Sequence, residues 1–471
     1  MKRADAAPLA IYDTLSREVR EVRASDGKAV RIYCCGPTVY RDAHIGNLRT
    51  FLLADLVRRS LEFSGVKVKL VQNITDVGHM SEDFEEDKMI AAAKVEKRDP
   101  YSIAREYEDR FHKDCAALNI KPADQYPRAS ECIELMIDSI HNLMAKGFAY
   151  QGEDGSVYFD STKFESYGAL SGNRLDALKP GHRYEFTEAG AKRFHADWAL
   201  WKAAGERKEM IWDTPWGRGF PGWHIECSAM SLKYLAGKVD LHIGGIDLRF
   251  PHHENERAQS NPLIAGSGEE AVTLWLHGEH LLFEGRKMSK SSGNVILIKD
   301  VVARGLDPLS LRFCFMENRY RSQMDLSWSS IQAAHNLLER WRKSYQEWLG
   351  DSALHSSRVA ALVTEIAQEF GDDLDTPQAI LKLRTIERSE FSAGEKRALF
   401  EALDPLFGLN LLELRATKSL PDEARALLEA RAKARAERDF KSSDSLREQL
   451  AILGIEVRDT ADGQEWSWRV N

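Results

Sequence analysis

One short segment of the chain places two lysines among small residues. Lys287-Met288-Ser289-Lys290-Ser291 is followed directly by Ser292 and Gly293. Small residues keep such a loop mobile, and its two ammonium groups can clamp a triphosphate. Charge that moves from an α-phosphate onto pyrophosphate is stabilised by cations and needs no covalent protein nucleophile. The segment therefore predicts a nucleotide-phosphate site, against the alternative of a solvated loop of lysine and serine.

A second segment, His44-Ile45-Gly46-Asn47, lies where a loop is expected to enter a helix. The first turn of a helix presents free N–H groups and a positive dipole to an anion. Gly46 lets a planar group or a phosphate approach the backbone closely. His44 and Asn47 can each donate to a phosphate oxygen. A motif of four residues is weak evidence by itself, and the alternative is an ordinary helix start with a surface histidine.

Cysteine, histidine and glutamate residues form a third candidate site, this time for a metal ion. The run Pro251-His252-His253-Glu254-Asn255-Glu256 places His252 and Glu256 four residues apart, on one face of a helix. His253 with Glu256, three apart, is the competing pair. Thiolate, imidazole and carboxylate are all zinc ligands. Cys35 and Cys227 are candidate thiolates, although an isolated buried cysteine is usually only a small apolar side chain.

The elements around these residues predict an α/β fold. Residues 30–35 form a short apolar run, leucines recur at helical spacing over 48–61, and 66–72 alternate like a strand. Strand, loop, helix and strand make a βαβ unit, and such units build parallel sheets. Cys34 and Cys35 face opposite sides of the first strand, so at most one of them can bind the metal. Further strands are expected at 239–243 and 272–276.

The rest of the chain divides by composition. Helices are expected at about 100–119 and 130–146, the latter ending at Gly147. Residues 150–222 hold short strand candidates such as 157–159 among many Gly, Pro and Trp, and are read as an insertion. A helical region follows from Asp307-Pro308 to about 390, and a charged helix opens the segment 420–471.

Length and charge limit the class of protein. The chain has 471 residues, which implies more than one domain, and 65 basic against 73 acidic residues give a net charge of −8. The acidic balance weakly disfavours a nucleic-acid partner, although local basic faces can still bind RNA. The sequence has no apolar run long and uncharged enough to indicate a membrane span, and its N-terminus lacks the apolar stretch of a signal peptide. A cytoplasmic protein is therefore expected. Six cysteines are too few for a disulfide scaffold.

The combined motifs resemble the cysteinyl-tRNA synthetases of class I. The similarity covers nearly the whole chain and is carried by several short strings. They are Cys35-Gly36-Pro37-Thr38-Val39-Tyr40, His44-Ile45-Gly46-Asn47, Asn73-Ile74-Thr75-Asp76, Pro221 to Met230, Phe250 to Glu256, Lys287 to Ser291, Tyr320-Arg321-Ser322, and Asp439-Phe440-Lys441 with Asp444 and Leu446-Arg447. The strings around Cys227 and His252 are specific to this family, whereas the nucleotide motifs are common to class I.

This resemblance implies an α/β architecture with a Rossmann-like parallel-sheet catalytic domain split by an insertion. A helical bundle and a small C-terminal α/β domain would follow it. The implied boundaries are 1–119 and 223–306 for the two catalytic halves, 120–222 for the insertion, 307–415 for the bundle and 416–471 for an anticodon-binding domain.

The resemblance also implies residue roles. The implied zinc ligands, one ion per chain, are Cys35, Cys227, His252 and Glu256. The implied catalytic residues are His44, Asn47, Lys287 and Lys290, and Mg²⁺ would accompany ATP. ATP binding would add Gly46, Gly244, Gly245, Met288, Ser289 and Ser291. The implied cysteine pocket is Thr75, Trp223, His224 and Asp247, with Asp247 facing the α-amino group.

The implied function is activation of L-cysteine by ATP and its transfer to tRNA(Cys), carried out by a monomer. Cysteine and serine differ by sulfur for oxygen, which a hydrophobic pocket rejects poorly, whereas zinc prefers a thiolate strongly. A ligase that couples cysteine to a small amine, as in mycothiol synthesis, is one alternative. A catalytically silent tRNA-binding paralogue is the other.

Several segments depart from the family pattern or have uncertain roles. Asn47 stands where many class I enzymes have histidine, residues 77–87 are unusually acidic, and residues 183–198 are enlarged. The acidic stretch is read as a solvated loop rather than a second metal site. In the C-terminal segment, candidate phosphate contacts are Arg431, Lys433, Arg435, Arg438 and Lys441, and candidate base-stacking residues are Trp466 and Trp468. A salt-bridged surface helix with core tryptophans is the alternative there.

Overall fold

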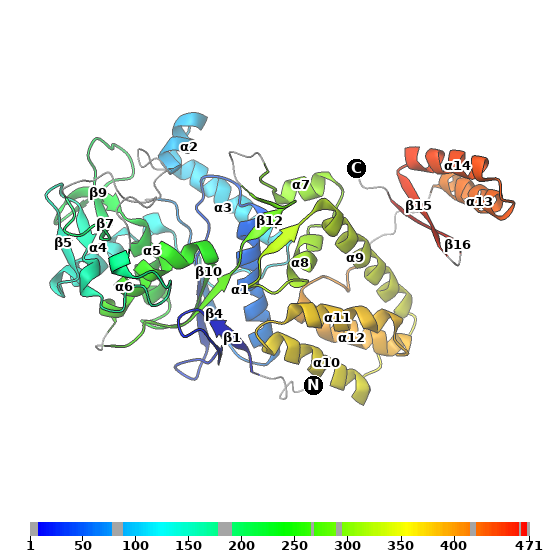
Figure 1. Cartoon of the computed structure of the whole chain (residues 1–471), viewed down its shortest axis with the longest axis horizontal. Coiled ribbons are helices and arrows are strands. Elements are labelled where there is room, and N and C mark those ends of the chain that lie inside the picture. Colours follow the sequence, from blue (N-terminus) through cyan, green and yellow to red (C-terminus); the bar gives the residue numbers. More distant parts are fainter. Residues whose placement is uncertain are drawn as a thin grey trace. The chain divides into compact units, whose positions relative to one another are not determined.

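The computed structural model describes residues 8–77, 88–177, 191–264, 268–288, 294–414, 421–460 and 463–468. The described parts of 1–298 and 309–412 form one compact unit, and those of 299–308 and 413–471 form a second. Figure 1 shows the elements of both. No helix among the described residues is long and apolar enough to cross a membrane.

A four-stranded parallel sheet forms the centre of the first unit. Its strands are β3 (Val30–Cys34), β4 (Val68–Gln72), β10 (Val239–Gly245) and β11 (Val272–Gly278), in the order β11-β10-β3-β4. The predicted βαβ unit is confirmed, because β3 and β4 pair in parallel and one helix connects them. The chain leaves β3 toward one side of the sheet and returns as β10 on the other. Ligands of parallel sheets bind at the carboxyl ends of strands at such a reversal.

The connecting helix, α1 (Ile45–Phe63), follows the predicted leucine spacing. Leu48, Leu52 and Leu56 are buried on it, and it ends at Ser64. Gly65 follows at a φ of 81°, a left-handed conformation that glycine adopts without strain. In Figure 1, α1 passes through the middle of the unit, beside β12.

The segment between the two halves of the sheet combines helices with a separate antiparallel sheet. The helices are α2 (Lys88–Glu96), α3 (Pro100–Ala117) and α4 (Ile133–Ala145). The sheet has the order β5-β6-β7-β9-β8, with strands at Ala149–Gln151, Val157–Phe159, Trp198–Ala203, Gly217–Pro221 and Trp212–Thr214 respectively. The strand predicted at 157–159 is therefore present as β6. Trp198 and Trp201 of β7 are fully buried and supply much of the core of this sheet.

The chain after the insertion adds the elements that surround the sheet's carboxyl edge. They are α5 (Trp223–Tyr234), a wide turn at Arg249–His253, α6 (Glu254–Leu263) and a small sheet of β12 (Leu281–Phe283), β13 (Arg286–Lys287) and β14 (Met324–Leu326). A short hairpin, β1 (Ala10–Asp13) with β2 (Glu18–Glu21), lies beside β11. α7 (Ile298–Ala303) follows β13 in the chain.

Helices dominate the later part of the first unit. They are α8 (Leu309–Met316), α9 (Trp328–Trp348), α10 (Ser357–Gly371), α11 (Thr376–Arg388) and α12 (Ala393–Phe407). The helical region thus runs farther than the predicted end near residue 390. A buried ion-pair cluster fixes α1 to α8, because Asp55 accepts from both Arg59 and Arg312 at 2.7 Å.

The second unit includes two helices and a hairpin near the end of the chain. They are α13 (Asp422–Ala436), α14 (Phe440–Ile452), β15 (Ile455–Thr460) and β16 (Gly463–Trp468). Ala424, Leu428, Leu450, Ile455 and Val457 form its small core.

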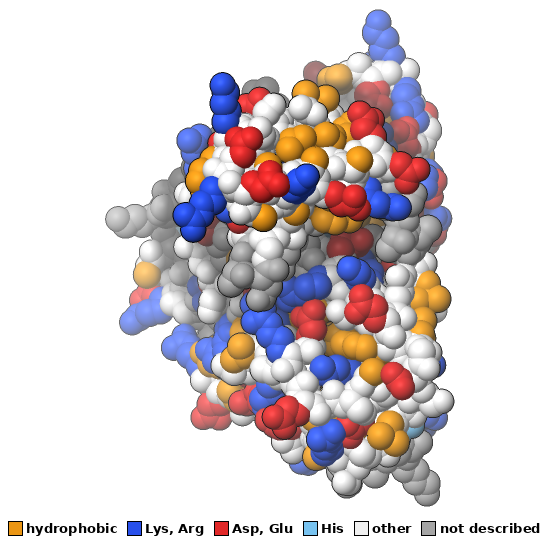
Figure 2. All heavy atoms as spheres, turned by 90° about the vertical axis from the view of Figure 1, so that its right-hand side faces the viewer, with side chains coloured by type: hydrophobic (Ala, Val, Ile, Leu, Met, Phe, Trp, Pro, Cys, Tyr) orange, Lys and Arg blue, Asp and Glu red, His pale blue; other side chains and the backbone are white. Residues whose placement is uncertain are grey.

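On the face of the molecule shown in Figure 2, acidic and basic side chains are interspersed, so basic groups are exposed on a protein whose net charge is negative.

Candidate active site and metal cluster

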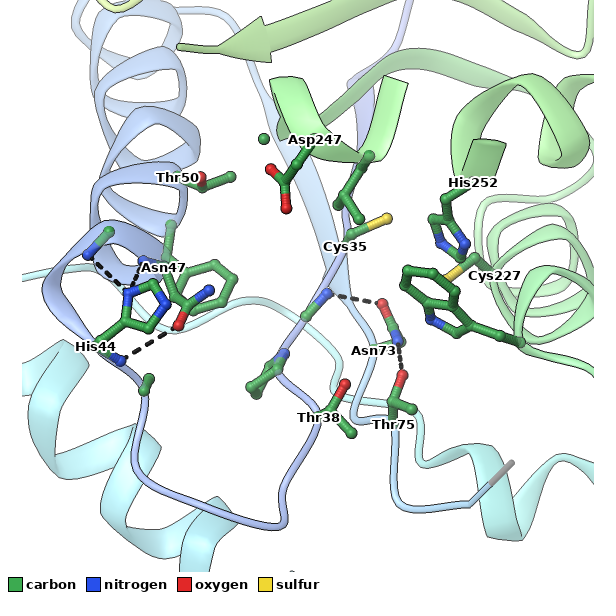
Figure 3. Close-up of a pocket in the computed structure, with 18 of the residues that line it drawn as sticks. Cys35, Thr38, His44, Asn47, Thr50, Asn73, Thr75, Cys227, Asp247 and His252 are labelled. Carbon is green, nitrogen blue, oxygen red and sulfur yellow. Dashed lines mark hydrogen bonds between the residues drawn. The ribbon is translucent and has the colours of Figure 1, made fainter. Parts of the chain in front are cut away.

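A cavity of about 500 Å³ opens at the carboxyl ends of β3 and β10. It is the place that the reversal of strand order predicts. Figure 3 shows Cys35, Cys227 and His252 toward one end of this pocket and His44 and Asn47 toward the other. One cavity therefore connects the candidate metal ligands with the candidate phosphate-binding residues.

Four of the lining or adjacent side chains form a compact donor set. One ligand atom from each of Cys35, Cys227, His252 and Glu256 lies within 4.8 Å of the others, and all four residues are buried. Cys35 follows β3, Cys227 lies on α5, His252 lies in the turn before α6, and Glu256 lies on α6. The His252 Nε2 lies 2.9 Å from the Glu256 Oε1. The structure thus brings together all four metal ligands that the sequence analysis named.

A second, overlapping donor set shares two of these residues. Cys35 and Glu256 also group with His242 and His253. The His253 Nε2 lies 3.3 Å from the Cys35 Sγ, and the His242 Nε2 lies 2.9 Å from a Glu256 carboxylate oxygen. Because the sets share a thiol and a carboxylate, they compete for one ion. Sequence reasoning considered His253 but missed His242, whose position inside a buried apolar strand was the only available indication.

The ionisable groups of the cluster shift one another's pKa values. A hydrogen bond from the Cys35 thiol and the charge of His252 lower the pKa of Cys227 to about 6, against the effect of burial. Burial alone would raise the pKa of Glu256, but the charges of His242 and His252 outweigh it and lower that pKa to about 2. Burial likewise opposes the charged form of His252, yet Glu256 and Cys227 raise its pKa to about 10. A cation would replace the buried proton on His252.

Neighbouring rings hold His252 in position. Its Nδ1 lies 2.8 Å from the Nδ1 of His224, and its ring stacks on Trp223 with centroids 4.1 Å apart. A hydrogen bond on the second ring nitrogen is how proteins orient a metal-binding histidine. Cys34 is directed elsewhere, since its sulfur accepts from the Gln72 amide at 3.7 Å. Of these two adjacent cysteines, Cys35 alone belongs to the donor sets found among the described residues.

At the other end of the pocket, His44 caps α1. Its Nδ1 accepts from the backbone N–H groups of Gly46 and Asn47 at 3.1 and 3.3 Å. The expectation of free N–H groups at this helix start is therefore wrong for these two residues, because the histidine ring takes them. A neutral ring whose Nδ1 accepts must carry its proton on Nε2. His44 lines the cavity, so this Nε2–H is the donor that it offers there.

Asn47 completes the cap and keeps its own donor. Its Oδ1 accepts from the His44 backbone N–H at 3.2 Å, which leaves the amide NH₂ for a ligand.

Burial, assisted by the charge of Arg41, lowers the pKa of His44 to about 4, so the ring is neutral near pH 7. Both side chains thus offer uncharged donors at the start of α1.

The lysine segment approaches the same helix start. Lys287 and Met288 line the cavity, and a Cβ added to Gly46 would lie 3.0 Å from the His44 ring and 3.1 Å from the Met288 Cε. These two side chains therefore pack closely against Gly46. Ser289, Lys290 and Ser291 lie outside the residues that the structure describes.

The remaining predicted pocket residues line the same cavity. They are Thr75, Trp223, His224, Gly245 and Asp247.

Hydrogen bonds and close packing fix several of these residues. The Thr75 hydroxyl accepts from the Asn73 amide at 3.1 Å and donates to Glu226 at 3.3 Å. A Cβ on Gly245 would meet the Asp247 carboxylate at 2.4 Å, whereas one on Gly244 would meet the His253 ring at 2.4 Å. Gly244 therefore borders the histidine cluster rather than the open cavity.

Comparisons with known proteins decide the family. Residues 21–336 match the family model described as the class I (C) catalytic domain of tRNA synthetases, and residues 417–466 match the anticodon-binding domain of cysteinyl-tRNA ligase. Cysteine–tRNA ligase 1 of Burkholderia lata is 41% identical over 97% of this chain and 96% of its own. A cysteine–tRNA ligase of Thermus thermophilus is 40% identical over 97% and 99%. This chain belongs to the cysteine–tRNA ligase family.

Solved structures show the same fold in more distant proteins. Methionyl-tRNA synthetase of Mycobacterium tuberculosis bound by methionyl-adenylate superposes with a TM-score of 0.56 at 15% identity, covering 88% of this chain and 96% of that one. A LeuRS of Agrobacterium radiobacter K84 in a ternary complex has a TM-score of 0.61 at 11% identity, covering 82% and 84%. The class I α/β fold expected from the sequence is confirmed.

The C-terminal candidates separate into structural and exposed groups. Arg431 is only 1% exposed and donates to Asp459 at 3.0 Å, so the structural interpretation holds for it. Arg435 also pairs with Asp459, at 2.9 Å, but is partly exposed. Lys433, Arg438 and Lys441 are exposed, and the Trp466 ring is 41% exposed. The side chain of Trp468 lies outside the described set.

Proposed function

We propose that this ligase activates L-cysteine with Mg²⁺-ATP and transfers it to tRNA(Cys). The observation that carries the proposal is the shared cavity, which has a thiol-containing donor set at one end and phosphate donors at the other. The match of residues 417–466 to an anticodon-binding domain favours tRNA over a small amine as the acceptor.

We propose zinc as the metal, held by Cys35, Cys227, His252 and Glu256. Two sulfurs, one imidazole and one carboxylate within 4.8 Å of one another suit a zinc ion. The burial of a thiolate and a carboxylate together also needs a cation to compensate their charge. When bound, zinc would supply selectivity for a substrate thiolate over a neutral hydroxyl. His224, through its contact with His252, would keep that ligand oriented.

The chain's own residues would then position the first reaction step. Asp247, at the edge of the cavity beside Gly245, would accept from the substrate's α-ammonium group. The substrate carboxylate would attack the α-phosphorus of ATP, forming the acyl-phosphate bond as the bond to pyrophosphate breaks. His44, Asn47 and Lys287, with Lys290 from the adjoining segment, would neutralise the charge that moves onto pyrophosphate.

The second step needs no protein nucleophile. A terminal ribose hydroxyl of the tRNA would attack the carbonyl carbon of cysteinyl-adenylate, and AMP would leave. The C-terminal unit would bind the anticodon region through exposed basic groups such as Lys433 and Lys441.

Two assays on the purified protein test this function. Cysteine-dependent ATP–pyrophosphate exchange reports the first step, and charging of tRNA with labelled cysteine reports the second. We expect both activities. Exchange without charging would indicate a ligase for a small amine, and the absence of both would leave only a tRNA-binding role.

A further inference from the structure

We propose that Arg49 is a positioning residue that fixes the distance between the phosphate donors of α1 and Lys287. This proposal rests on the proposed function, since it concerns the same phosphate site. Arg49 does not line the cavity. It lies two residues after Asn47 on α1 and is 7% exposed.

The Arg49 guanidinium donates only to backbone carbonyls. Its Nη1 donates to the carbonyl oxygens of Glu279 and His280 at 2.7 and 3.1 Å. Its Nη2 donates to those of Arg319 and Ser322 at 3.2 and 3.0 Å. Among the described residues, no carboxylate forms an ion pair with it. The planar guanidinium thus joins two chain segments that lie about 40 residues apart in the sequence.

Both segments lead directly into the small sheet that carries Lys287. Residues 279–280 immediately precede β12, and Ser322 lies two residues before the start of β14. β12 pairs with β14 on one side and with β13 on the other, where Leu282 is opposite Lys287. A continuous set of backbone hydrogen bonds therefore connects the Arg49 side chain to the backbone of Lys287.

The segment 319–322 is also held from its other side. Tyr320 donates its hydroxyl proton to Asp373, Arg321 donates to the same carboxylate at 2.7 Å, and Arg319 pairs with Asp375. These contacts fix the segment whose carbonyls face Arg49. They also give a structural role to the first two residues of the string Tyr320-Arg321-Ser322.

Lysine cannot reproduce this arrangement. An ammonium group has three donors on a flexible stem, whereas guanidinium has five in a rigid plane. Arg49→Lys therefore keeps the charge but loses part of the carbonyl contacts, so the β12–β13 turn gains freedom relative to α1. Arg49 donates to none of the proposed cysteine-pocket residues or metal ligands, so we expect the substitution to leave the cysteine pocket and the metal cluster intact.

The test measures kcat and KM of pyrophosphate exchange for Arg49→Lys. Arg342→Lys is the control, because Arg342 is also buried and donates to the carbonyls of Leu409 and Asn410, neither of which precedes β12 or β14; it also pairs with Glu339. We expect kcat to fall about 10- to 100-fold in Arg49→Lys, with the KM for cysteine changed less than twofold and the zinc content unchanged. A misplacement of about 1 Å costs about 100-fold in rate.

A double variant shows whether the effect passes through Lys287. In a Lys287→Ala background, Arg49→Lys should cost less than threefold in kcat, because the group that it positions is gone. A full loss in that background would overturn the proposal, as would wild-type kcat in the single variant or an equal loss in Arg342→Lys. A parallel loss of zinc and of kcat would also overturn it, since it would indicate general disruption.

Asp373→Asn provides a second variant in case Arg49→Lys does not fold. It loosens the segment 319–322 from its other side and should give the same loss of kcat with unchanged KM for cysteine. Wild-type KM and kcat in Asp373→Asn would then overturn the proposal. Failure of the wild-type protein to exchange pyrophosphate with cysteine would instead refute the proposed function.

Discussion

Gly46→Ala separates the catalytic role of the α1 cap from its structural role. The added methyl would lie 3.0 Å from the Cε1 and Nδ1 atoms of His44 and 3.1 Å from the Met288 Cε, so these neighbours must move by a few tenths of an ångström. Since a misplacement of about 1 Å costs about 100-fold in rate, the expected loss of kcat in adenylate formation is roughly 3- to 10-fold.

The same change should leave stability almost unaltered. Weakening the two hydrogen bonds that His44 accepts costs about 1 kcal/mol, which is typical of an N-cap. Replacing glycine by alanine inside a helix contributes about 1 kcal/mol in the opposite direction. The melting temperature should therefore stay within a few degrees of the wild-type value.

Cysteine-dependent pyrophosphate exchange and thermal unfolding are measured on the same samples. Gly350→Ala is the control, because the nearest atom to its added Cβ lies 3.8 Å away. An unchanged kcat in Gly46→Ala would refute the placement of His44 at the reacting phosphates. A loss of kcat that comes with a large drop in melting temperature would refute the separation of the two roles.

Three more predictions concern stability and tRNA binding. Burial lowers the pKa of His44 to about 4, so below about pH 6.5 the unfolded chain binds a proton that the folded chain does not. The contribution of His44 to the free energy of unfolding should therefore be constant above about pH 6.5 and fall between about pH 6.5 and 4, and urea unfolding of His44→Gln should lack this pH dependence. Asp55→Asn leaves Arg312 buried without its partner and should cost about 3–5 kcal/mol in urea unfolding; a smaller cost than about 1 kcal/mol would contradict it. Arg431→Ala should lower the melting temperature of the C-terminal unit, whereas Lys433→Ala should weaken tRNA binding in a filter assay without affecting melting.

The regular elements could be predicted because their apolar spacing is local. Leu48, Leu52 and Leu56 occupy one buried stripe of α1, and the alternation before Gln72 gives the strand β4. Such patterns follow from the 3.6- and 2-residue periods of helix and strand. The apolar pattern after Pro308 indicates helix only to about residue 390, short of α12, whereas the family resemblance implies a bundle that extends to residue 415.

The metal cluster could be predicted only in part. Their four-residue spacing pairs His252 with Glu256, and their atoms do meet, although His252 lies in the turn Arg249–His253, where Phe250 is not helical. His242 could not be predicted, because its approach to Glu256 depends on the packing of β10 against α6. The choice between His252 and His253 came from family resemblance, and both rings reach the cluster.

Two other features depend on contacts that a sequence does not display. The capping of Gly46 and Asn47 by His44 requires a particular ring orientation, which the residue type alone leaves open. The partners of Arg49 are backbone carbonyls, which every residue type carries, so the residue types cannot identify them. Interactions of this kind become visible only when distant segments are placed in space.

The central claim is that a metal ion held by Cys227 and its three partners selects cysteine. Its most direct test is the ratio of kcat/KM for cysteine to that for serine in pyrophosphate exchange, measured for the wild type and Cys227→Ser. Cys132→Ser, at a buried thiol away from the cluster, is the control. We expect Cys227→Ser to lose bound zinc together with most of the preference for cysteine. Wild-type zinc content and an unchanged ratio in that variant would contradict the account.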